Sequence, residues 1–325
     1  MASFQAYLVS RDPSGAITRA LLARPLADLG SAGVLVRVHY SSLNYKDALA
    51  ATGHPGIVKA WPHVPGIDAA GTLADDPGQP VLLTGFGLGT EVWGGFGDYV
   101  RVPHDWVLPL PAGLTMAESM VLGTAGLTAA LAVDALITAD IRPDRGTVLV
   151  TGATGGVGSL SVLLLSQLGF AVVAATRQPE QAPYLKALGA QEVVIAEDHD
   201  DGKALHTPRW QAAIDTVGGR VLTWVVKGIA YGGAVAACGM AGGGEWQATV
   251  FPFILRGVRL FGIDSVWCPR SRRAALWQRL AGPWRPRNFE ILQTVITRAE
   301  LDRAIANLLQ GRHTGRTLVR VREAD

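Results

Sequence analysis

Residues 147–177 contain the feature that most restricts what this chain can fold into. A β-branched apolar run is followed there by a glycine-rich turn, an apolar helical pattern and a second apolar run. The expected segments are a strand at 147–151, a turn at 152–158, a helix at 157–168 with Gly169 as its stop, and a strand at 171–175. This order predicts a βαβ unit, the context in which a glycine turn can bind a dinucleotide.

The turn reads Gly152-Ala153-Thr154-Gly155-Gly156-Val157-Gly158, with alanine in the first glycine position of the usual fingerprint. Glycines let a pyrophosphate approach the first turn of the helix, where free N–H groups and the helix dipole favour its negative charge. We therefore expect cofactor binding at a run of five turn residues, namely Ala153, Thr154, Gly155, Gly156 and Val157. The alternative is an ordinary tight turn, which would not require both flanking strands and the helix.

The end of the second strand distinguishes NADPH from NAD. NAD sites usually place Asp or Glu there, to bind the ribose 2′-hydroxyl. This chain has Thr176, Arg177 and Gln178 instead, and its next carboxylate is Glu180. An arginine attracts a 2′-phosphate, whereas a carboxylate would repel it. We expect these three residues to bind NADPH; the alternative is that Arg177 is only an exposed loop residue.

The composition restricts the class of protein and of partner. With 325 residues, 49% hydrophobic and 17% charged, the chain is typical of a globular enzyme with two domains. A formal net charge of +2 gives no strong attraction to nucleic acid or to membranes. The two cysteines, Cys238 and Cys268, are too few for a disulfide framework. No signal-peptide pattern and no segment long enough to span a bilayer are recognised, so a cytoplasmic enzyme with a small-molecule substrate is expected.

The rest of the chain divides into two modules. Residues 1–122 contain short strands separated by glycine and proline, which predicts an all-β module in the form of a distorted barrel. Residues 123–265 alternate strands and helices, which predicts an α/β fold, a Rossmann-type doubly wound parallel sheet. Residues 266–325 are expected to return to the first module, so that 1–122 with 266–325 form one domain and the active site lies in the cleft between the domains.

Two local patterns add to this division. Thr115 and Glu118 have the spacing of a capping box, which predicts the start of a helix. The apolar run at 259–264 is expected to be the last strand of the parallel sheet, and its open edge would need cover. Since a twofold-related copy can pair with such an edge, we expect a homodimer.

Several motifs outside the glycine turn indicate a family. They are Ser41-Ser42-Leu43-Asn44-Tyr45-Lys46-Asp47, Val64-Pro65-Gly66-Ile67-Asp68, Gly94-Gly95-Phe96-Gly97-Asp98-Tyr99-Val100, Phe251-Pro252-Phe253-Ile254-Leu255-Arg256 and Gly262-Ile263-Asp264-Ser265-Val266. In these motifs and in its order of modules, nearly the whole chain resembles the zinc-independent medium-chain dehydrogenase/reductases. Within them it looks like the acryloyl-CoA reductase branch, the YhdH/AcuI type first labelled quinone oxidoreductases. The resemblance implies a GroES-like, β-rich catalytic domain joined to the Rossmann-type domain.

The resemblance also implies chemistry without a metal. Alcohol dehydrogenases of this superfamily take zinc ligands from a Cys-His-x-Asp and a Gly-His-Glu segment, where this chain has Asn44-Tyr45-Lys46-Asp47 and Gly66-Ile67-Asp68. Hydride addition to an activated double bond needs no zinc, because the substrate carbonyl spreads the developing charge. The implied reaction is NADPH-dependent reduction of a short α,β-unsaturated acyl thioester, acryloyl-CoA to propionyl-CoA, with hydride added at the β-carbon and a proton at the α-carbon.

Site residues follow from the same resemblance. Tyr45 and Asn44 are the catalytic candidates; Tyr45 would also contact the nicotinamide, although it can equally pack in the core while solvent supplies the proton. Asp47 is expected to orient Lys46. The remaining cofactor-binding candidates are Thr128 for the diphosphate or nicotinamide amide, Met240, Ile254 and Ser265 for the nicotinamide pocket, and Arg316 for a phosphate. Each is also a plausible core or surface residue, and Asp215, which ends a strand, is also a plausible helix N-cap.

Three alternatives stay open. The substrate can be a quinone or a free enone, since the fingerprint does not separate these from an acyl thioester. The chain can also be a non-catalytic NADPH-binding protein, as crystallin-like relatives of the superfamily are. Finally, a cluster of arginines and tryptophans can hold coenzyme A or form a solvated helix face over core tryptophans. Its members are Arg270, Arg272, Arg273, Arg279, Arg285, Arg287, Trp267, Trp277 and Trp284.

Overall fold

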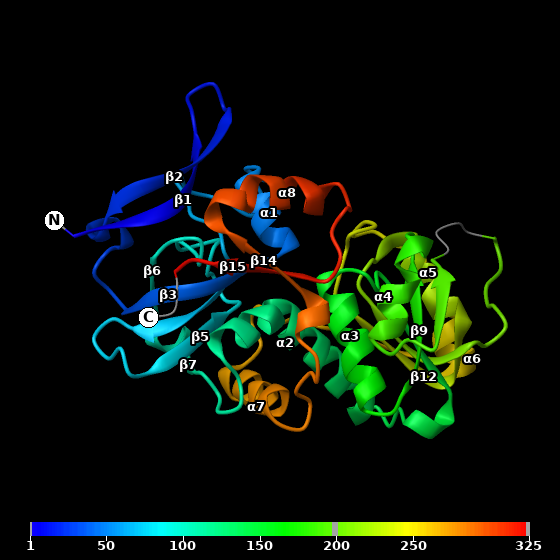
Figure 1. Cartoon of the computed structure of the whole chain (residues 1–325). Coiled ribbons are helices and arrows are strands. Elements are labelled where there is room, and N and C mark those ends of the chain that lie inside the picture. Colours follow the sequence, from blue (N-terminus) through cyan, green and yellow to red (C-terminus); the bar gives the residue numbers. More distant parts are fainter. Residues whose placement is uncertain (1, 197–200, 323–325) are drawn as a thin grey trace. The chain divides into compact units, whose positions relative to one another are not determined.

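The structure is a computed structural model that describes residues 2–196 and 201–322. The chain divides into two compact units (Figure 1). The first unit comprises Met1–Thr124, Val266–Gly282 and Leu292–Asp325, and the second comprises Ala125–Ser265 and Pro283–Ile291. The fold is therefore the expected pairing of a β-rich domain with a parallel-sheet domain, and each unit is described by itself below.

The second unit contains a parallel sheet of six strands within the described residues. In spatial order the strands are β10 (Glu192–Ile195), β9 (Ala171–Thr176), β8 (Thr147–Val150), β11 (Trp210–Asp215), β12 (Ile229–Ala237) and β13 (Arg259–Gly262). Every neighbouring pair is parallel. Strand order runs outward in one direction from β8 and in the other from β11, so the topological switch point lies between these two strands. The prediction of a doubly wound sheet is confirmed.

The inner strands of this sheet are buried in the second unit because their sequences are mostly apolar, without strict alternation of apolar and polar residues. Val148, Leu149 and Val150 of β8 are each 0% exposed, as expected of a parallel strand covered on both faces. The helices that pack on the sheet are α3 (Gly156–Gln167) on β8 and β9, α4 (Ala182–Ala187) on β10, α5 (Gly219–Gly228) on β11 and β12, and α6 (Phe251–Arg256) on β12. Gly169 follows the end of α3 and has φ of +86°, the left-handed conformation that is expected of a glycine ending a helix.

The first unit contains a mostly antiparallel sheet and a hairpin. The described sheet has the order β14 (Gln293–Thr297), β15 (Arg316–Arg320), β3 (Val34–Leu43), β4 (Asp68–Leu73), β5 (Pro80–Thr84) and β7 (Leu108–Pro109), with β6 (Tyr99–Val102) also on β3. The hairpin consists of β1 (Ser3–Arg11) and β2 (Ile17–Pro25). Among the described strands, the sheet ends at β14 on one side and at β7 on the other, so it is an open sheet where a barrel was expected.

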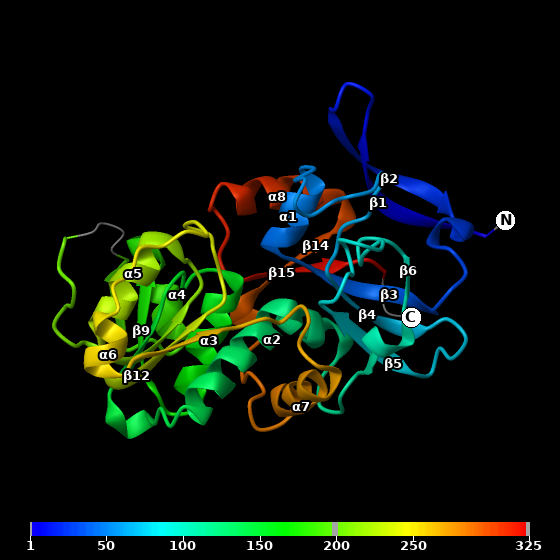
Figure 2. The same ribbon diagram turned by 180° about the vertical axis from the view of Figure 1, so that it is seen from behind.

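The prediction that residues 1–122 are all-β is wrong, because helix α1 (Tyr45–Ala51) lies within them. Asn44 caps α1: the Asp47 carboxylate accepts a hydrogen bond from the Asn44 backbone N–H at 2.8 Å. This reciprocal cap closes the N-terminus of a helix with only two turns. Helix α8 (Leu301–Leu309) lies beside α1 in both views (Figure 2), and α7 (Arg270–Ala281) is the other helix of the returning segment.

Helix α2 (Met116–Thr138) corrects a second expectation, that no segment is long enough to span a bilayer. It has 23 residues and a mean hydropathy of 1.8 over its most apolar window, so by length and composition alone it could cross a membrane. However, 78% of that window is buried inside the protein, which is typical of a core helix. Its predicted start is confirmed, because Glu118 N–H donates to Thr115 Oγ1 and Thr115 N–H donates to Glu118 Oε2.

The division of the chain differs from the expected one in one segment. Pro283–Ile291 belongs to the second unit, whereas the whole of 266–325 was expected in the first. Gln167 of α3 explains the difference, since its Nε2 donates to the Arg285 carbonyl at 3.3 Å. Within the segment, the Arg285 guanidinium lies 5.2 Å from the centre of the Phe289 ring. The segment therefore packs on α3 before the chain returns to β14.

Candidate functional site

The glycine turn occupies the switch point of the parallel sheet. It follows β8, whose neighbours are β9 and β11, and it leads into α3. Gly152 has φ of +57°, a left-handed conformation that residues with a side chain rarely adopt. A Cβ on Gly158 would lie 2.2 Å from the Gly152 carbonyl oxygen, so only glycine allows α3 to approach the strand this closely. Ligands of doubly wound sheets bind outside the carboxyl ends of the strands at this point.

The five turn residues predicted to bind the cofactor lie together at the start of α3. Gly155 precedes the helix, and Gly156 and Val157 are its first two residues. Gly155 N–H donates to the Gly152 carbonyl at 3.0 Å, whereas the N–H groups of Gly156 and Val157 have no acceptor within the helix and are available to an anion. Ala153 and Thr154 are buried, and Ala153 N–H donates to the Ala175 carbonyl at 3.1 Å. The turn can therefore present backbone donors, rather than side chains, to a phosphate.

The predicted ribose-binding residues follow β9, the strand beside β8. Thr176 is buried, and its hydroxyl accepts a hydrogen bond from the Gln178 backbone N–H at 3.0 Å. Thr176 therefore shapes the turn, and Arg177 is the exposed cation at its tip. The next carboxylate, Glu180, is also exposed. This end of the strand can accept a negatively charged ribose substituent.

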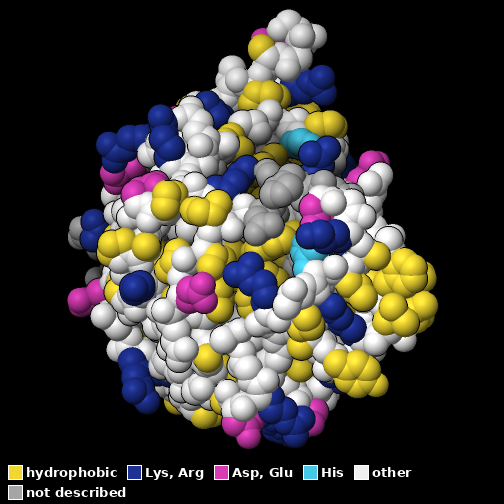
Figure 3. Space-filling view, turned by 90° about the vertical axis from the view of Figure 1, so that its right-hand side faces the viewer, with side chains coloured by type: hydrophobic (Ala, Val, Ile, Leu, Met, Phe, Trp, Pro, Cys, Tyr) yellow, Lys and Arg dark blue, Asp and Glu magenta, His cyan; other side chains and the backbone are white. Residues whose placement is uncertain are grey.

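Of the residues predicted for the nicotinamide pocket, the structure brings two together. Thr128 Oγ1 donates to Ser265 Oγ at 2.8 Å, and both side chains are buried. Met240, which follows β12, is 71% exposed, and Ile254 on α6 is 67% exposed. The structure thus places Met240 and Ile254 on the surface of the second unit. Figure 3 shows one face of the molecule, on which apolar side chains gather in small patches between Lys and Arg side chains.

A buried polar cluster surrounds Asn44 in the first unit. Asn44 Nδ2 donates to Asp68 Oδ2 at 2.8 Å, while its Oδ1 accepts from Arg316 Nη1 at 3.1 Å. Asp68 is 0% exposed and also accepts hydrogen bonds from Ser42 Oγ at 2.6 Å and from Thr124 Oγ1 at 2.6 Å. The Asn44 amide is therefore engaged on both sides by neighbouring side chains. We call Ser42, Asn44, Asp47, Asp68, Thr124 and Arg316 the buried cluster.

Tyr45, the other catalytic candidate, is the first residue of α1 and is 51% exposed. The alternative that it packs in the core is therefore wrong. Because Asn44 caps the same helix and is fixed by Asp68 and Arg316, the buried cluster also fixes the direction in which Tyr45 leaves the helix. Tyr45 is available to a ligand of the first unit.

Asp47 was expected to orient Lys46, but the structure gives Asp47 other partners. Its Oδ1 accepts from the backbone N–H groups of Gly66 at 3.0 Å and Ile67 at 2.8 Å, and the residue is 0% exposed. It therefore fastens α1 to the segment that leads into β4. Burial, and secondarily the negative charge of Asp68, raise the pKa of Asp47 to about 7, against the backbone N–H bonds that lower it.

Arg316 was expected to reach a phosphate, and the structure places it elsewhere. The residue is 2% exposed. Its Nε donates to the Val121 carbonyl at 2.8 Å and its Nη2 to Ser42 Oγ at 2.9 Å, with Asp68 Oδ2 at 4.0 Å. Burial lowers the pKa of Arg316, while Asp68 and Asp47 raise it in part. The guanidinium is thus the cation of the buried cluster.

The arginine and tryptophan cluster has a buried part and an exposed part, and its exposed arginines are Arg270, Arg272, Arg279 and Arg287. Arg273 is 0% exposed, and its Nη1 donates to the Thr84 carbonyl at 2.7 Å while its guanidinium covers the Phe86 ring. Trp277 and Trp284 are buried, and Trp267 is 60% exposed. A buried Arg273 cannot reach the phosphates of coenzyme A, so the interpretation as a helix face over core tryptophans describes this part of the cluster better.

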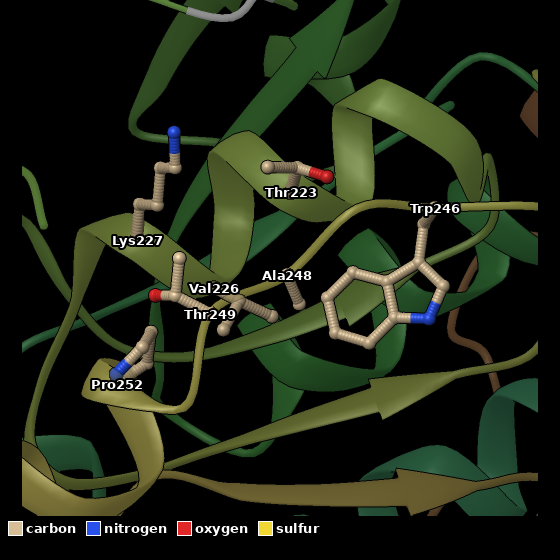
Figure 4. A pocket seen from close by; sticks show the side chains of 7 residues that line it. All are labelled: Thr223, Val226, Lys227, Trp246, Ala248, Thr249 and Pro252. Atoms are coloured by element: carbon tan, nitrogen blue, oxygen red, sulfur yellow. The ribbon is translucent and has the colours of Figure 1, made fainter. Parts of the chain in front are cut away.

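Two cavities lie within single units. One of about 10 Å³ lies beside α5 and is lined by Thr223, Val226, Lys227, Trp246, Ala248, Thr249 and Pro252 (Figure 4). It has room for one water molecule at most. The other, of about 300 Å³ in the first unit, is lined by Val34, Leu73, Asp75, Gln79, Val81, His104, Val107, Pro109 and Arg270. Arg270 Nη2 already donates to the Val107 carbonyl there at 3.1 Å.

Sequence reasoning missed the polar residues that support the site. Ser42, Asp68 and Thr124 belong to the buried cluster, although Asp68 entered the sequence analysis only as a position without a zinc ligand. Asp215 is not the N-cap of α5, because Gly218 occupies that position. Its carboxylate instead accepts from Thr151 Oγ1 at 2.6 Å. The available signal was a carboxylate at one end of an apolar strand, since Asp215 ends β11 and Asp68 begins β4.

Comparison with known proteins gives consistent matches over the whole chain. Two family models match: an alcohol dehydrogenase GroES-like domain over residues 30–112 and a zinc-binding dehydrogenase domain over residues 156–281. YhfP of Bacillus subtilis, whose provisional name is quinone oxidoreductase, is 48% identical over 90% of this chain and 92% of its own length. The acrylyl-CoA reductase AcuI of Ruegeria pomeroyi is 42% identical over 98% of this chain and 99% of its own length.

Solved structures of similar proteins hold nicotinamide dinucleotides. The crystal structure of Escherichia coli K-12 YhdH with bound NADPH has a TM-score of 0.94 at 43% identity, covering 98% of this chain and 100% of that one. The crystal structure of B. subtilis yhfP with NAD bound also has a TM-score of 0.94, at 44% identity, covering 99% and 100%. The solved structures of these relatives therefore contain a dinucleotide with the 2′-phosphate in one case and a dinucleotide without it in the other.

The description of the second family model implies zinc, and the side chains present do not fit that metal. Among residues 2–196 and 201–322, no group of three or more His, Cys, Asp and Glu side chains could hold a metal ion. Zinc is bound in proteins by thiolate, imidazole and carboxylate donors in groups of three or four. Asp47 and Asp68 are the carboxylates near Asn44, and both already accept several protein hydrogen bonds.

Proposed function

Because the chain belongs to the medium-chain dehydrogenase/reductase family of oxidoreductases, we propose that it reduces the C=C bond of a short α,β-unsaturated acyl thioester with NADPH. The substrate class is that of acryloyl-CoA, which would be converted to propionyl-CoA. One observation carries this proposal: the near full-length similarity, at 42% identity, to a protein named acrylyl-CoA reductase. The glycine turn at the switch point and the exposed Tyr45 support it.

The residues that fit the dinucleotide are those of the second unit. The N–H groups of Gly156 and Val157 would bind the pyrophosphate, as at other helix N-termini that follow a glycine turn. Arg177 would pair with the 2′-phosphate, and its exposed guanidinium at the end of β9 supports NADPH over NADH. Thr128 and Ser265 would present a hydroxyl pair to the nicotinamide portion. Met240 and Ile254 remain candidates for that pocket, from a more exposed position.

When bound, NADPH supplies a hydride from nicotinamide C4 to the β-carbon of the substrate. The π electrons of the C=C bond then move to the thioester oxygen, and the α-carbon takes a proton to complete the product. Tyr45 would hold that proton at its phenolic oxygen or pass it from water, and Asn44 would set the position of Tyr45 through the cap of α1. The mechanism needs no metal, because the thioester carbonyl stabilises the developing charge.

Steady-state kinetics on the full chain tests the proposal. The consumption of NADPH is followed with acryloyl-CoA, crotonyl-CoA and a benzoquinone, and kcat/KM is compared among them. A kcat/KM at least tenfold higher for acryloyl-CoA than for the quinone is expected. A preference for the quinone would replace this proposal with a quinone reductase, which the provisional name of YhfP favours. Binding of NADPH without turnover of any of the three would favour a non-catalytic protein.

We further propose that the enzyme is a homodimer. β13 (Arg259–Gly262) is the edge strand of the parallel sheet, and its side chains are mostly exposed, including Leu260 at 37%. An exposed apolar edge is usually covered, and a twofold-related copy is a common way to do so. Light scattering after size-exclusion chromatography would give twice the mass of 34.3 kDa, and a value of one chain mass would exclude the dimer.

A cytoplasmic location is also proposed. Cys238 and Cys268 are both free thiols, and burial raises the pKa of Cys238 to about 12, which keeps its thiol protonated and inert. Free thiols are typical of proteins in reducing compartments. Fractionation of the native cell, with detection by an antibody, would test this, and recovery in a membrane or extracellular fraction would contradict it.

A further inference from the structure

The carboxyl ends of β8 and β11 are joined by a buried carboxylate that the proposed reaction does not use. Asp215 is the last residue of β11 and is 0% exposed. Its Oδ1 accepts from Thr151 Oγ1 at 2.6 Å, and its Oδ2 accepts from the Gly218 backbone N–H at 2.8 Å. Thr151 is the residue between β8 and the glycine turn. The carboxylate therefore connects two strands at the point where the strand order of the sheet reverses.

Thr216 strengthens this connection. Its backbone N–H donates to Thr151 Oγ1 at 3.1 Å, and its own hydroxyl donates to the Thr151 carbonyl at 2.9 Å. Thr151 Oγ1 thus both donates and accepts a hydrogen bond. A Cβ on Gly152 would lie 2.3 Å from Thr216 Oγ1. The first residue of the glycine turn is therefore held against the turn that follows β11.

Residues 215–218, the turn that begins with Asp215, also hydrogen-bond to the segment that follows β12. Cys238 N–H donates to the Asp215 carbonyl at 2.9 Å, and Gly242 N–H donates to the Val217 carbonyl at 2.7 Å. Residues 215–218 thus lie between the glycine turn on one side and residues 238–242 on the other. Three turns at the carboxyl edge of the sheet share one set of hydrogen bonds.

Charge makes this arrangement costly for a purely structural purpose. Burial raises the pKa of Asp215, against the hydrogen bonds from Thr151, Gly218 and Val217 that lower it. These hydrogen-bond partners are neutral groups. Replacing both partners of a buried hydrogen bond with apolar groups of the same shape can be nearly neutral or stabilising. The carboxylate of Asp215 therefore points to a need to hold the backbone of the glycine turn in one position.

We propose that Asp215 is a positioning residue for the dinucleotide, acting through Thr151 and Thr216. By fixing Thr151, it fixes the glycine turn at the spacing that the pyrophosphate needs in order to reach the N–H groups of Gly156 and Val157. The inference rests on the proposed function, because it requires a bound dinucleotide. Asp215 does not itself contact the cofactor in this mechanism. The effect falls on the part that NADPH and NADH share, unlike an effect at Arg177.

The test compares threonine variants of one strand in the full chain. Thr151→Val removes the hydroxyl and keeps the volume, and Thr151→Ser restores the hydroxyl. Thr147→Val is the matched control, since Thr147 begins the same strand and donates only at 3.3 Å to the Arg209 carbonyl. Binding of NADPH and NADH is titrated by the fluorescence of the reduced nicotinamide, and steady-state kinetics gives KM for NADPH and kcat separately.

Thr151→Val is expected to weaken NADPH and NADH by the same factor, about tenfold, the effect of losing one to two hydrogen bonds. KM for NADPH should rise accordingly, with little change in kcat, while Thr151→Ser and Thr147→Val bind as the wild type does. Asp215→Asn is the second variant, because Asn can still accept from Thr151 but cannot accept the Gly218 N–H with its amide nitrogen. It should weaken both nucleotides equally, by a smaller factor.

The outcomes separate this inference from the proposed function. Wild-type protein that binds neither nucleotide would overturn both. Wild-type protein that binds NADPH, with unchanged dissociation constants in folded Thr151→Val and Asp215→Asn, would overturn only the positioning role. If Thr151→Val does not fold, as judged by circular dichroism, Asp215→Asn decides. A loss confined to NADPH would also contradict the inference, because it would indicate an effect on the 2′-phosphate.

Discussion

The buried cluster of the first unit makes a strong prediction about Arg316. Replacing Arg316 with Met keeps much of the side-chain volume and removes the positive charge that faces two buried carboxylates, Asp47 and Asp68. The change also leaves the Val121 carbonyl and the Asn44 amide oxygen without the donors that Arg316 provides at 2.8 and 3.1 Å. We therefore expect a loss of stability confined to the first unit.

Its magnitude follows from the contacts. Removing one partner of a buried ion pair costs about 3–5 kcal/mol, because the other charge stays buried without compensation. Here the closest approach of Arg316 to Asp68 is 4.0 Å, and Asp68 keeps hydrogen bonds from Ser42 and Thr124. The lower end of that range, about 3 kcal/mol, is therefore expected. Arg320→Met is the matched control, since Arg320 ends the same strand and is exposed; its effect should stay within about 0.5 kcal/mol.

Hydrogen exchange during urea unfolding is a suitable assay, because the two units need not unfold together. Peptides from β3 and β15 report the first unit, and peptides from β8 and β11 report the second. The variant Asp68→Asn provides a further check: in that background, Arg316→Met should cost about 1–2 kcal/mol less, since the uncompensated charge is gone. A loss below about 1 kcal/mol for Arg316→Met, or no coupling with Asp68→Asn, would refute the reasoning.

Three further predictions concern the site and its pH dependence. Tyr45→Phe should lower kcat on acryloyl-CoA by less than about tenfold, because water can also protonate the α-carbon; a loss above a thousandfold in steady-state kinetics would make the Tyr45 hydroxyl essential. Arg177→Ser should reduce the preference for NADPH over NADH by about tenfold, the loss of one charge-assisted contact; an unchanged ratio of kcat/KM values would place the 2′-phosphate elsewhere. Burial, with the charge of Arg316, lowers the pKa of His313 to about 4. As the pH falls, the imidazole of His313 is therefore protonated in the unfolded chain at a higher pH than in the folded one. Stability from His313 is therefore present above its ordinary pKa and lost as the pH falls toward 4, and His313→Asn should remove about 2 kcal/mol of the stability difference between pH 7 and pH 4. Urea unfolding at both pH values would show this, and parallel curves for the two proteins would contradict it.

Local patterns predicted most of the second unit and, in the first unit, the start of α2. The βαβ unit at 147–177, the stop at Gly169 and the capping box of Thr115 and Glu118 depend on neighbours within a few residues, and each is confirmed. Period and turn chemistry carry this information directly. Long-range pairing is different, as the segment 283–291 shows: its place with α3 depends on Gln167, more than a hundred residues earlier.

Polar residues in the core were the least predictable part of the site. Arg316 was predicted as a phosphate ligand from the family resemblance, and the sequence cannot show that Ser42, Asn44 and Val121 would surround it. Asp47 was assigned to its neighbour Lys46, but its true partners, Gly66 and Ile67, lie in a separate segment. Helix α1 was missed because it has only seven residues and follows β3 after a single residue, Asn44.

The position of β15 in the sheet has a consequence for how this protein is made. β15 lies between β14 and β3, and Arg316 is 273 residues from the Leu43 carbonyl to which it donates. As a ribosome extends the chain, β3 emerges long before β15, which pairs with residues 40–43 of one of its edges. The sheet of the second unit, by contrast, uses strands from 147 to 262 alone. We expect the sheet of the second unit to be complete in the nascent chain while residues 40–43 of β3 still expose an unpaired edge, and in this interval a chaperone would bind that edge.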